Sequence, residues 1–116
     1  MRKVVVWNKT KESVILPKVY VAERFFDRLR GLMGTKELDL DAGLLIRPCN
    51  SVHTFFMKFS IDVAFMDKDG QVCYIIYSMG KNKVSPIVSK ASSVLEASSG
   101  TFKGCNVAIG DIIEFI

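Results

Sequence analysis

The sequence contains few of the residues that crosslink small secreted domains or hold metals. It has three cysteines and one histidine in 116 residues. Because three is an odd number, a disulfide framework of the kind found in secreted proteins would leave one thiol unpaired. The cysteine content therefore fits a reducing cytoplasm better than an oxidising compartment, and the cytoplasm is the expected location.

Long apolar runs are also absent. No run approaches the ~18 apolar residues that a transmembrane helix needs. The N-terminal segment has only four consecutive apolar residues, Val4 to Trp7, whereas the core of a signal peptide needs roughly seven or more. We therefore expect a soluble, unexported protein with no membrane association.

Charge of either sign is not concentrated enough to indicate a polyanion-binding protein. The 16 basic residues are balanced against 12 acidic ones, which leaves a net charge of +4 and only a mild attraction to polyanions. Arg24, Arg28, Arg30 and Lys36 form a basic set, but no RNA-recognition or helix-turn-helix pattern accompanies them. A solvated helix face is the favoured interpretation, and no specific nucleic-acid binding is expected.

The chain has enough apolar residues to fill one core. Its 49% hydrophobic content and its length are typical of one ordinary domain. No internal repeat, low-complexity tract or change in composition marks a boundary. We therefore predict a single globular domain over residues 1–116.

Short runs of β-prone residues dominate the secondary-structure pattern. The apolar runs fall at residues 4–7, 13–17, 43–46, 63–66, 72–77, 94–97 and 112–116. Asp69 and Gly70 separate two of them and predict an antiparallel hairpin. Phe25, Leu29 and Leu32 recur at helical spacing. The pattern predicts a mainly β (α+β) fold, an antiparallel sandwich or barrel with one main helix near residues 22–33.

The segment "SVHTFFMKFSID", residues 51–62, combines a core pattern with polar residues. Alternation would place Phe55, Met57 and Phe59 on a core face. A straight strand running on to Phe65 would span ~50 Å, whereas a compact chain of this size is only about 35 Å across. We therefore expect a break near Ser60, which could gather nearby polar side chains around a bend.

Several residues of this segment have both a structural and a functional interpretation. His53 is either a hydrogen-bonded structural or surface histidine, or a ligand contact or acid–base group. Lys58 and Asp62 are either a solvated or structural ion pair, or part of a site. Phe56 either marks a contact surface or packs under the polar loop at residues 80–89.

The cysteines permit two further hypotheses. Cys49 and His53 could bind zinc together with Cys73 and Cys105, but the spacing matches no compact zinc module. The second is a nucleophilic pair of a cysteine with His53, although nothing in the sequence positions a thiol against the imidazole. Free, unreactive cysteine is the favoured interpretation, and no metal or cofactor is predicted.

Three separated pieces of the chain together resemble one known family. They are "RLRGLMG", "HTFFMKFSIDVAFMDKDGQV" and "VLEASSGTFKGCNVAIGDIIEF", and they are similar to the bacterial and archaeal family called domain of unknown function 192. The resemblance implies a single, mainly β domain with a helix at the arginine–glycine segment, and it implies no activity. The family's motif positions fall here on Arg30, Gly31, Leu32, Met33, Phe56, Met57, Lys58, Asp62, Glu96, Gly100, Gly110 and Asp111, and Ser60 stands where a proline is common.

Charged side chains within apolar strands are costly to bury unpaired, so they are the best candidates for a site. The candidate ligand-binding residues are Arg30, Met33, His53, Phe56, Lys58, Asp62 and Glu96. The first hypothesis is a pocket for a small polar or anionic ligand, lined by the "HTFFMK" and "RGLM" segments. The second is a module that docks a protein partner through Phe56 and the loop at residues 80–89. The third is a hydrolase or transferase that uses His53 with Asp62 or Glu96.

Overall fold

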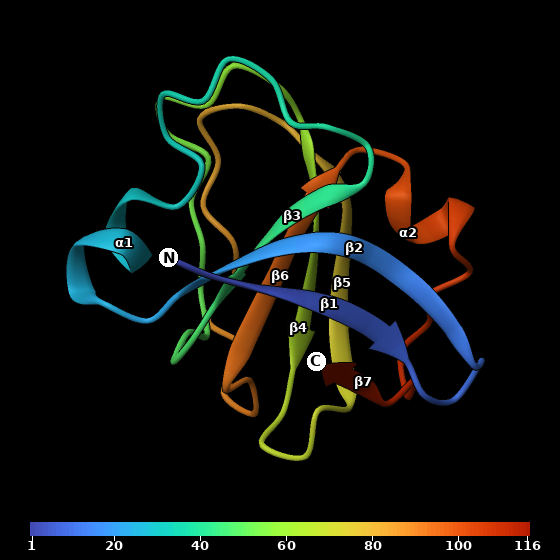
Figure 1. The fold of residues 1–116 in the computed structure, drawn as a ribbon. Coiled ribbons are helices and arrows are strands. Elements are labelled where there is room, and N and C mark those ends of the chain that lie inside the picture. The colour runs from blue at the N-terminus through green and yellow to red at the C-terminus, as the bar shows by residue number, and fades with distance from the viewer.

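The computed structural model describes residues 1–116 and consists of one seven-stranded sheet with two short helices (Figure 1). The strands and helices are β1 (Arg2–Asn8), β2 (Ser13–Ala22), α1 (Phe25–Arg30), β3 (Ala42–Ile46), β4 (Ile61–Met66), β5 (Val72–Met79), β6 (Ser93–Ser98), α2 (Thr101–Gly104) and β7 (Ile113–Phe115). The order in the sheet is β5-β4-β6-β3-β2-β1-β7. The predicted mainly β fold is confirmed.

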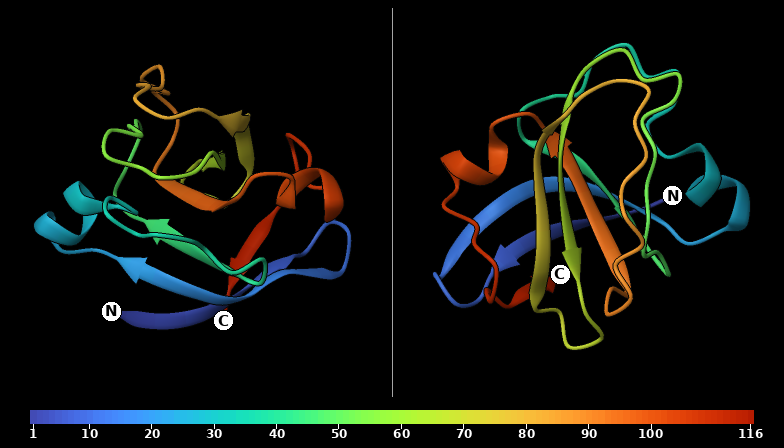
Figure 2. Two further views of the ribbon diagram at one scale, coloured as in Figure 1. Left: turned by 90° about the horizontal axis from the view of Figure 1, so that it is seen from above. Right: turned by 180° about the vertical axis from the view of Figure 1, so that it is seen from behind.

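The sheet is curled into a half-barrel, as the view from above shows (Figure 2). Its two edge strands meet at one end, where Gln71 and Ile112 form an isolated bridge and the Ile113 amide donates to the Gly70 carbonyl at 2.9 Å. All neighbouring strands are antiparallel except β2 and β3, which are parallel. The two helices lie at opposite ends of the sheet (Figure 1).

Each face of the curled sheet has its own apolar core. The inner core, inside the curl, contains large fully buried side chains such as Leu16, Leu45 and Phe102. The outer core covers the other face of β3, β4 and β6, beneath the long connections, and includes Ile46, Phe65 and other side chains. Alternate residues of β4 and β6 therefore belong to different cores, which decides where their acidic side chains point.

The hairpin predicted at Asp69 and Gly70 is present, and a further hairpin lies at the N-terminus. β1 pairs with β2, and β4 pairs with β5, both antiparallel. The second hairpin turns at Asp67–Gly70, where the Asp67 side chain accepts hydrogen bonds from the backbone amides of Asp69 and Gln71. Gly70 has φ of 81°, a left-handed conformation that favours glycine.

The main helix is shorter than predicted. It covers Phe25–Arg30 instead of residues 22–33, because Ala22 continues β2 and pairs with Ile46. Gly31 ends the helix with φ of 53°. No residue of α1 is buried, so the helical spacing of Phe25 and Leu29 does not place them in a core.

The segment before β4 is not a strand. The chain turns at residues 55–56, and β4 begins at Ile61, next to the break expected near Ser60. Met57 is buried and Phe59 is half-buried against the outer core, as alternation predicts. Phe55 is 41% exposed, so its assignment to the core was wrong, since the turn rotates it out of the alternating pattern.

None of the helices is long and apolar enough to cross a lipid bilayer.

Candidate functional site

A cavity of about 300 Å³ lies between α1 and the connection that follows β3. Its lining comes from Phe25 and residues 28–31 of the α1 region, from Ile46 and residues 48–53, and from Glu96 of β6. These pieces are remote in the sequence but meet over the outer face of the sheet. The cavity therefore lies against the outer core.

Glu96 forms the inner wall of this cavity. It lies in β6 between Leu44 of β3 and Val63 of β4, and both of these neighbours belong to the outer core. The Glu96 residue is 3% exposed, and its Oε1 atom has no hydrogen-bond partner. A buried carboxyl oxygen without a partner is costly, so this atom is the most unusual feature of the site.

Burial also changes the protonation of this group. Loss of hydration raises the pKa of Glu96 to about 8, because the apolar surroundings disfavour the charged form. The side chain is therefore mostly a neutral carboxylic acid at pH 7. In that form it can donate a hydrogen bond into the cavity as well as accept one.

Gly31 keeps the space above this carboxyl open. A Cβ atom at residue 31 would lie 3.7 Å from Glu96 Oε1, so any side chain here would extend the wall toward the carboxyl. The left-handed conformation of Gly31 also turns the chain away from α1. Gly31, at the end of the helix, thereby lies next to the Glu96 side chain.

Arg28 brings a second unsatisfied polar group to the cavity. Its Nη1 atom donates to the Pro48 carbonyl oxygen at 3.3 Å, which joins α1 to the opposite wall. Its Nε atom is buried and has no partner. Arg30 also lines the cavity and is exposed. The site thus combines two guanidinium groups with one buried, neutral carboxyl.

The opposite wall, residues 48–53, is held in place by the polar connection between β5 and β6. The Val52 amide donates to Ser85 Oγ at 2.9 Å, and the Ser85 amide donates back to the Val52 carbonyl at 2.9 Å. The Val88 amide donates to the Asn50 carbonyl at 2.8 Å. The loop at residues 80–89 therefore supports the wall of the cavity.

Cys49 and His53 share this wall, but their bonding does not make a nucleophilic pair. Burial is the main cause that raises the pKa of the Cys49 thiol; the nearby Glu96 raises it further, while a hydrogen bond to Ser51 and the charge of Arg28 oppose the rise. The thiol is therefore protonated at neutral pH. His53 Nδ1 accepts a hydrogen bond from the Phe55 amide at 3.2 Å.

The other two cysteines lie away from this wall. Cys73 is in β5 and packs beside the outer core, and Cys105 packs against the inner core. All three cysteines are free, and no three His, Cys, Asp or Glu side chains form a group that could share a metal ion. The residues of the zinc hypothesis are therefore dispersed over the fold.

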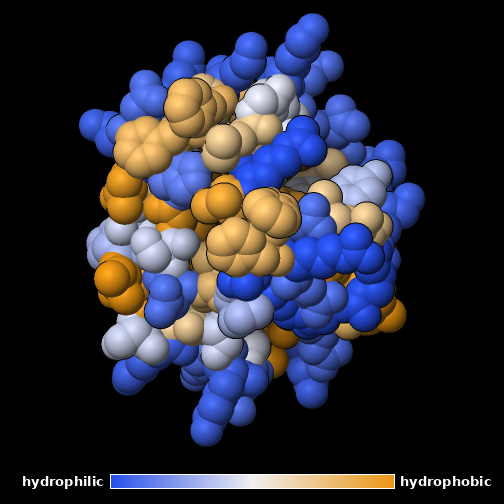
Figure 3. All heavy atoms as spheres, turned by 90° about the vertical axis from the view of Figure 1, so that its left-hand side faces the viewer, coloured by the Kyte–Doolittle hydropathy of each residue, from blue (hydrophilic) through white to orange (hydrophobic).

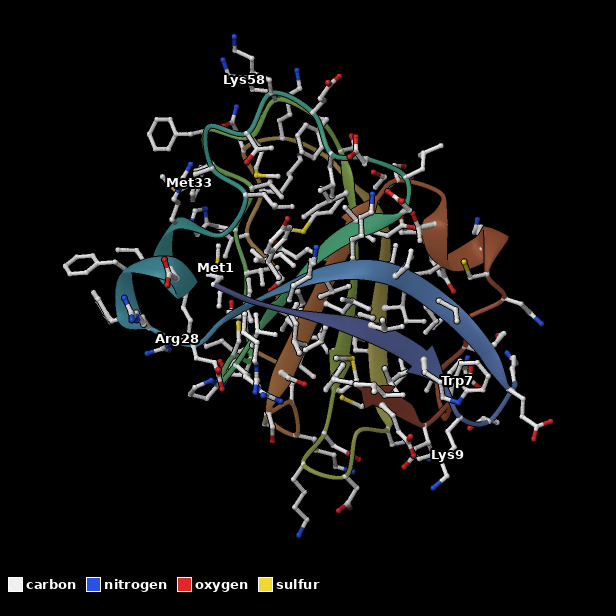
Figure 4. All side chains as sticks on the ribbon, viewed as in Figure 1. Met1, Trp7, Lys9, Arg28, Met33 and Lys58 are labelled. Atoms are coloured by element: carbon white, nitrogen blue, oxygen red, sulfur yellow. The ribbon has the colours of Figure 1, made fainter.

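Three of the seven candidate site residues line the cavity: Arg30, His53 and Glu96. Met33, Phe56 and Lys58 do not line it. Lys58 is exposed and points outward near the top of the molecule, with Met33 below it (Figure 4). Phe56 is 74% exposed and has φ of 61°, so it does not pack under the loop at residues 80–89.

Asp62 lies on the other face of the sheet. Its Oδ1 atom accepts a hydrogen bond from the Ser78 amide at 2.9 Å, and its Oδ2 atom accepts one from the Phe102 amide at 3.1 Å. The residue is fully buried and forms no ion pair with Lys58. Asp62 thus fixes α2 to the sheet, and its side chain points to the face of the sheet opposite Glu96.

The sequence interpretation missed Arg28 and the segment between Pro48 and Val52 as parts of a site. The basic set of the sequence predicts a solvated helix face for Arg28, whereas its Nη1 atom donates to Pro48, which comes twenty residues later in the chain. Cys49 was considered only for zinc or nucleophilic chemistry. The one available signal was the cluster of polar residues that directly follows the apolar strand β3.

Solved structures share this fold. A protein of unknown function from Novosphingobium aromaticivorans aligns with a TM-score of 0.83 and 20% identity, over 97% of this chain and 83% of its own. A putative transcription regulator from Sinorhizobium meliloti aligns with a TM-score of 0.84 and 22% identity, over 97% and 92%. These likenesses concern the fold alone.

Sequence comparison gives the family. A UPF0127 protein of Thermococcus sibiricus is 34% identical over 113 residues, which cover 93% of this chain and 72% of the relative. A second UPF0127 protein, from Thermococcus kodakarensis, is 30% identical over 114 residues, covering 93% and 71%. The model of the family DUF192, described as "Uncharacterized ACR, COG1430", matches residues 5–115. The chain therefore belongs to the DUF192 family, in agreement with the resemblance seen in its motifs.

Proposed function

We propose that the protein binds a small anionic ligand, a carboxylate or a phosphate, in the cavity between α1 and residues 48–53. The observation that carries the proposal is the buried carboxyl of Glu96, whose Oε1 atom has no partner and borders the cavity. Evolved interiors rarely leave such an atom unsatisfied. A ligand or ordered water that hydrogen bonds to it would remove a cost of about 1–3 kcal/mol.

The polar groups of the cavity favour an anion over a cation. Arg28 offers a buried Nε–H donor, and Arg30 adds a second positive charge. Glu96 adds little opposing charge at pH 6 to 7, because its raised pKa keeps it mostly protonated there. A ligand oxygen could therefore accept hydrogen bonds from a guanidinium and from a neutral carboxyl, which is a favourable setting for a carboxylate or phosphate.

The test is a titration of the protein with acetate and with inorganic phosphate, followed by amide chemical shifts in NMR at pH 6. We expect saturable shifts in residues around the cavity. Arg28→Met should weaken binding by roughly tenfold or more, which corresponds to the loss of one charge-assisted hydrogen bond of about 1.4 kcal/mol. Arg24→Met, at an exposed arginine next to the same helix, is the matched control and should bind as the wild type does.

The pH dependence gives a second readout of the same proposal. Affinity should fall as the pH rises through about 8, since ionised Glu96 would repel the anion. Glu96→Gln keeps a hydrogen-bond donor and should remove this dependence. The absence of saturable shifts with either anion, or an equal effect of Arg24→Met and Arg28→Met, would exclude the proposed function.

A protein-docking role remains the second candidate, favoured by Phe56. This large aromatic residue is 74% exposed and is held with φ of 61°, a conformation that is unusual for bulky residues. Phe56→Ala should then leave the midpoint of thermal unfolding unchanged and abolish co-purification of a partner. A large loss of thermal stability would instead assign Phe56 a structural role.

A further inference from the structure

Part of the rim of the cavity is apolar and exposed. Phe25 is 63% exposed and Leu29 is 56% exposed, yet both line the cavity from α1. Arg28 and Glu96 lie deeper, and both have buried polar atoms. The cavity therefore has polar groups inside and apolar side chains at part of its mouth.

The apolar surface continues beyond the rim. Phe26 is 77% exposed and packs edge-to-face on Phe25, with ring centroids 5.3 Å apart. The face of the molecule that carries α1 shows apolar side chains near its centre and further ones toward the upper left, with hydrophilic side chains between and around them (Figure 3). Because α1 buries none of its residues, these three side chains contribute no core packing that would explain them.

The size of the cavity limits how much of a ligand it can enclose. Its volume of about 300 Å³ is at the lower end of the range of roughly 300–1,000 Å³ for ligand pockets. An anionic head group can be enclosed, but a larger ligand must extend past the mouth. Phe25 and Leu29 offer exposed apolar surface at this mouth.

We infer that the ligand is an amphiphilic anion, whose carboxylate or phosphate head enters the cavity and whose alkyl or aryl body lies on Phe25, Leu29 and Phe26. This inference rests on the proposed function, because the head group must bind first. The apolar body would cover side chains that are otherwise exposed to water, which is favourable in proportion to the apolar area removed. A cationic amphiphile of the same length does not match the two arginines.

The test is a series of straight-chain carboxylates, from acetate through butanoate and hexanoate to octanoate, titrated at pH 6 below their micelle-forming concentrations. Affinity should rise about two- to fourfold per methylene group beyond butanoate, as expected for methylenes that are partly to fully buried. The matching alkylammonium series should bind far more weakly at every length. Alkyl phosphates of the same lengths show which of the two head groups is preferred.

Variants at the rim test where the alkyl body lies. The readout is the ratio of octanoate to acetate affinity, so that any general effect on the head group cancels. Leu29→Ser and Phe26→Ser should each lower this ratio by roughly threefold or more. Ile87→Ser is the matched control, because Ile87 is 76% exposed and does not line this cavity; it should leave the ratio unchanged.

The outcomes separate the two proposals. If neither acetate nor octanoate binds, the proposed function fails and the present inference fails with it. If acetate binds but affinity does not rise with chain length, only the amphiphilic ligand is excluded. Equal binding of alkylammonium and carboxylate, or equal effects of Ile87→Ser and Leu29→Ser, would also overturn the inference.

Discussion

Two acidic side chains, Glu96 and Asp62, are buried in neighbouring strands of the same sheet, yet they have different tasks. Asp62 accepts two backbone hydrogen bonds and is satisfied. Glu96 has an oxygen with no partner and a pKa raised to about 8. The difference follows from strand alternation, because one side chain faces α2 and the other faces the cavity. Burial alone therefore does not identify a site; the unsatisfied atom does.

The raised pKa of Glu96 predicts a specific pH dependence of stability. Between pH 4.5 and about 8 the unfolded chain releases this proton while the folded chain retains it. The free energy of unfolding should therefore fall as the pH rises through this window, by up to about 5 kcal/mol at 1.36 kcal/mol per unit. Urea unfolding between pH 5 and pH 8 measures it.

Glu96→Gln isolates this contribution. In this variant the free energy of unfolding should not fall between pH 5 and pH 8, and at pH 8 it should be higher than in the wild type. Glu37→Gln, at an exposed carboxyl, is the control and should keep the wild-type slope. If the free energy of unfolding of Glu96→Gln depended on pH as strongly as that of the wild type, the raised pKa would be contradicted.

Removing the Asp62 carboxylate should damage the fold instead of the site. Asp62→Ala leaves the amides of Ser78 and Phe102 without their acceptors, which we expect to cost about 2–4 kcal/mol. Asp62→Asn keeps one acceptor oxygen and should cost less. Urea unfolding gives both values, and a change in Asp62→Ala below about 0.5 kcal/mol would show that these hydrogen bonds stabilise little.

At the scale of elements, α1 shows what helical periodicity can and cannot predict. The spacing of Phe25, Leu29 and Leu32 located the helix correctly but implied that one face is buried. Only Leu32, which follows the helix, is buried. Periodicity predicts that apolar side chains share a face. Whether that face contacts a core, solvent or a ligand depends on which other segments of the chain pack next to it.

Gly31 should be required both to end α1 and to keep the cavity open. Gly31→Ala introduces a side chain at φ of 53°, which should lower the free energy of unfolding by about 1–3 kcal/mol. The new methyl would also lie near Glu96 Oε1 and should weaken carboxylate binding.

Gly34→Ala separates these two effects. Gly34 also has a positive φ, of 76°, but an added Cβ would meet no atom within 4 Å. The Gly34→Ala variant should therefore be less stable in urea unfolding but should bind the carboxylate as the wild type does in an NMR titration. If both variants bind the carboxylate as tightly as the wild type does, Gly31 does not shape the cavity.

At the scale of the whole molecule, the curled sheet depends on contacts that are remote in sequence. The short strands and the hairpin at Gly70 could be predicted, because alternation and turn residues are local signals. The strand order, the parallel pairing of β2 and β3, and the meeting of the sheet edges could not, since no local pattern encodes which strands become neighbours. The cavity is a consequence of that order.

The residues of the cavity likewise divide into those that the local sequence predicts and those that it does not. Glu96 could be identified from the sequence, because a charged residue within an apolar strand is costly to bury. Arg28 could not, because the carbonyl oxygen to which it donates belongs to Pro48 in a later segment. Asp62 was grouped with Glu96 for the same local reason but faces the other side of the sheet.

Closure of the sheet should be sensitive to a single methyl group at Gly70. A Cβ atom there would lie 2.7 Å from the Ile113 carbonyl oxygen, closer than non-bonded atoms tolerate, and the residue also has a positive φ. Gly70→Ala should lower the free energy of unfolding by about 2 kcal/mol or more and speed hydrogen exchange of the Ile113 amide.

Gly100→Ala is the control for this substitution, since Gly100 has φ of 92° and open space around it. It should lose stability through its backbone conformation alone and leave exchange at Ile113 unchanged. Equal exchange at Ile113 in the two variants would show that the edge contact does not hold the sheet closed.

The most direct test of the anion site is the titration of the Glu96 carboxyl carbon by ¹³C NMR, in protein labelled at glutamate and assigned by comparison with Glu96→Gln. The pKa should be near 8 in the free protein and should rise further with bound butanoate, because a neighbouring anion disfavours ionisation. A pKa near 4.5 in the free protein, or a pKa that butanoate does not change, would contradict an anion site at Glu96.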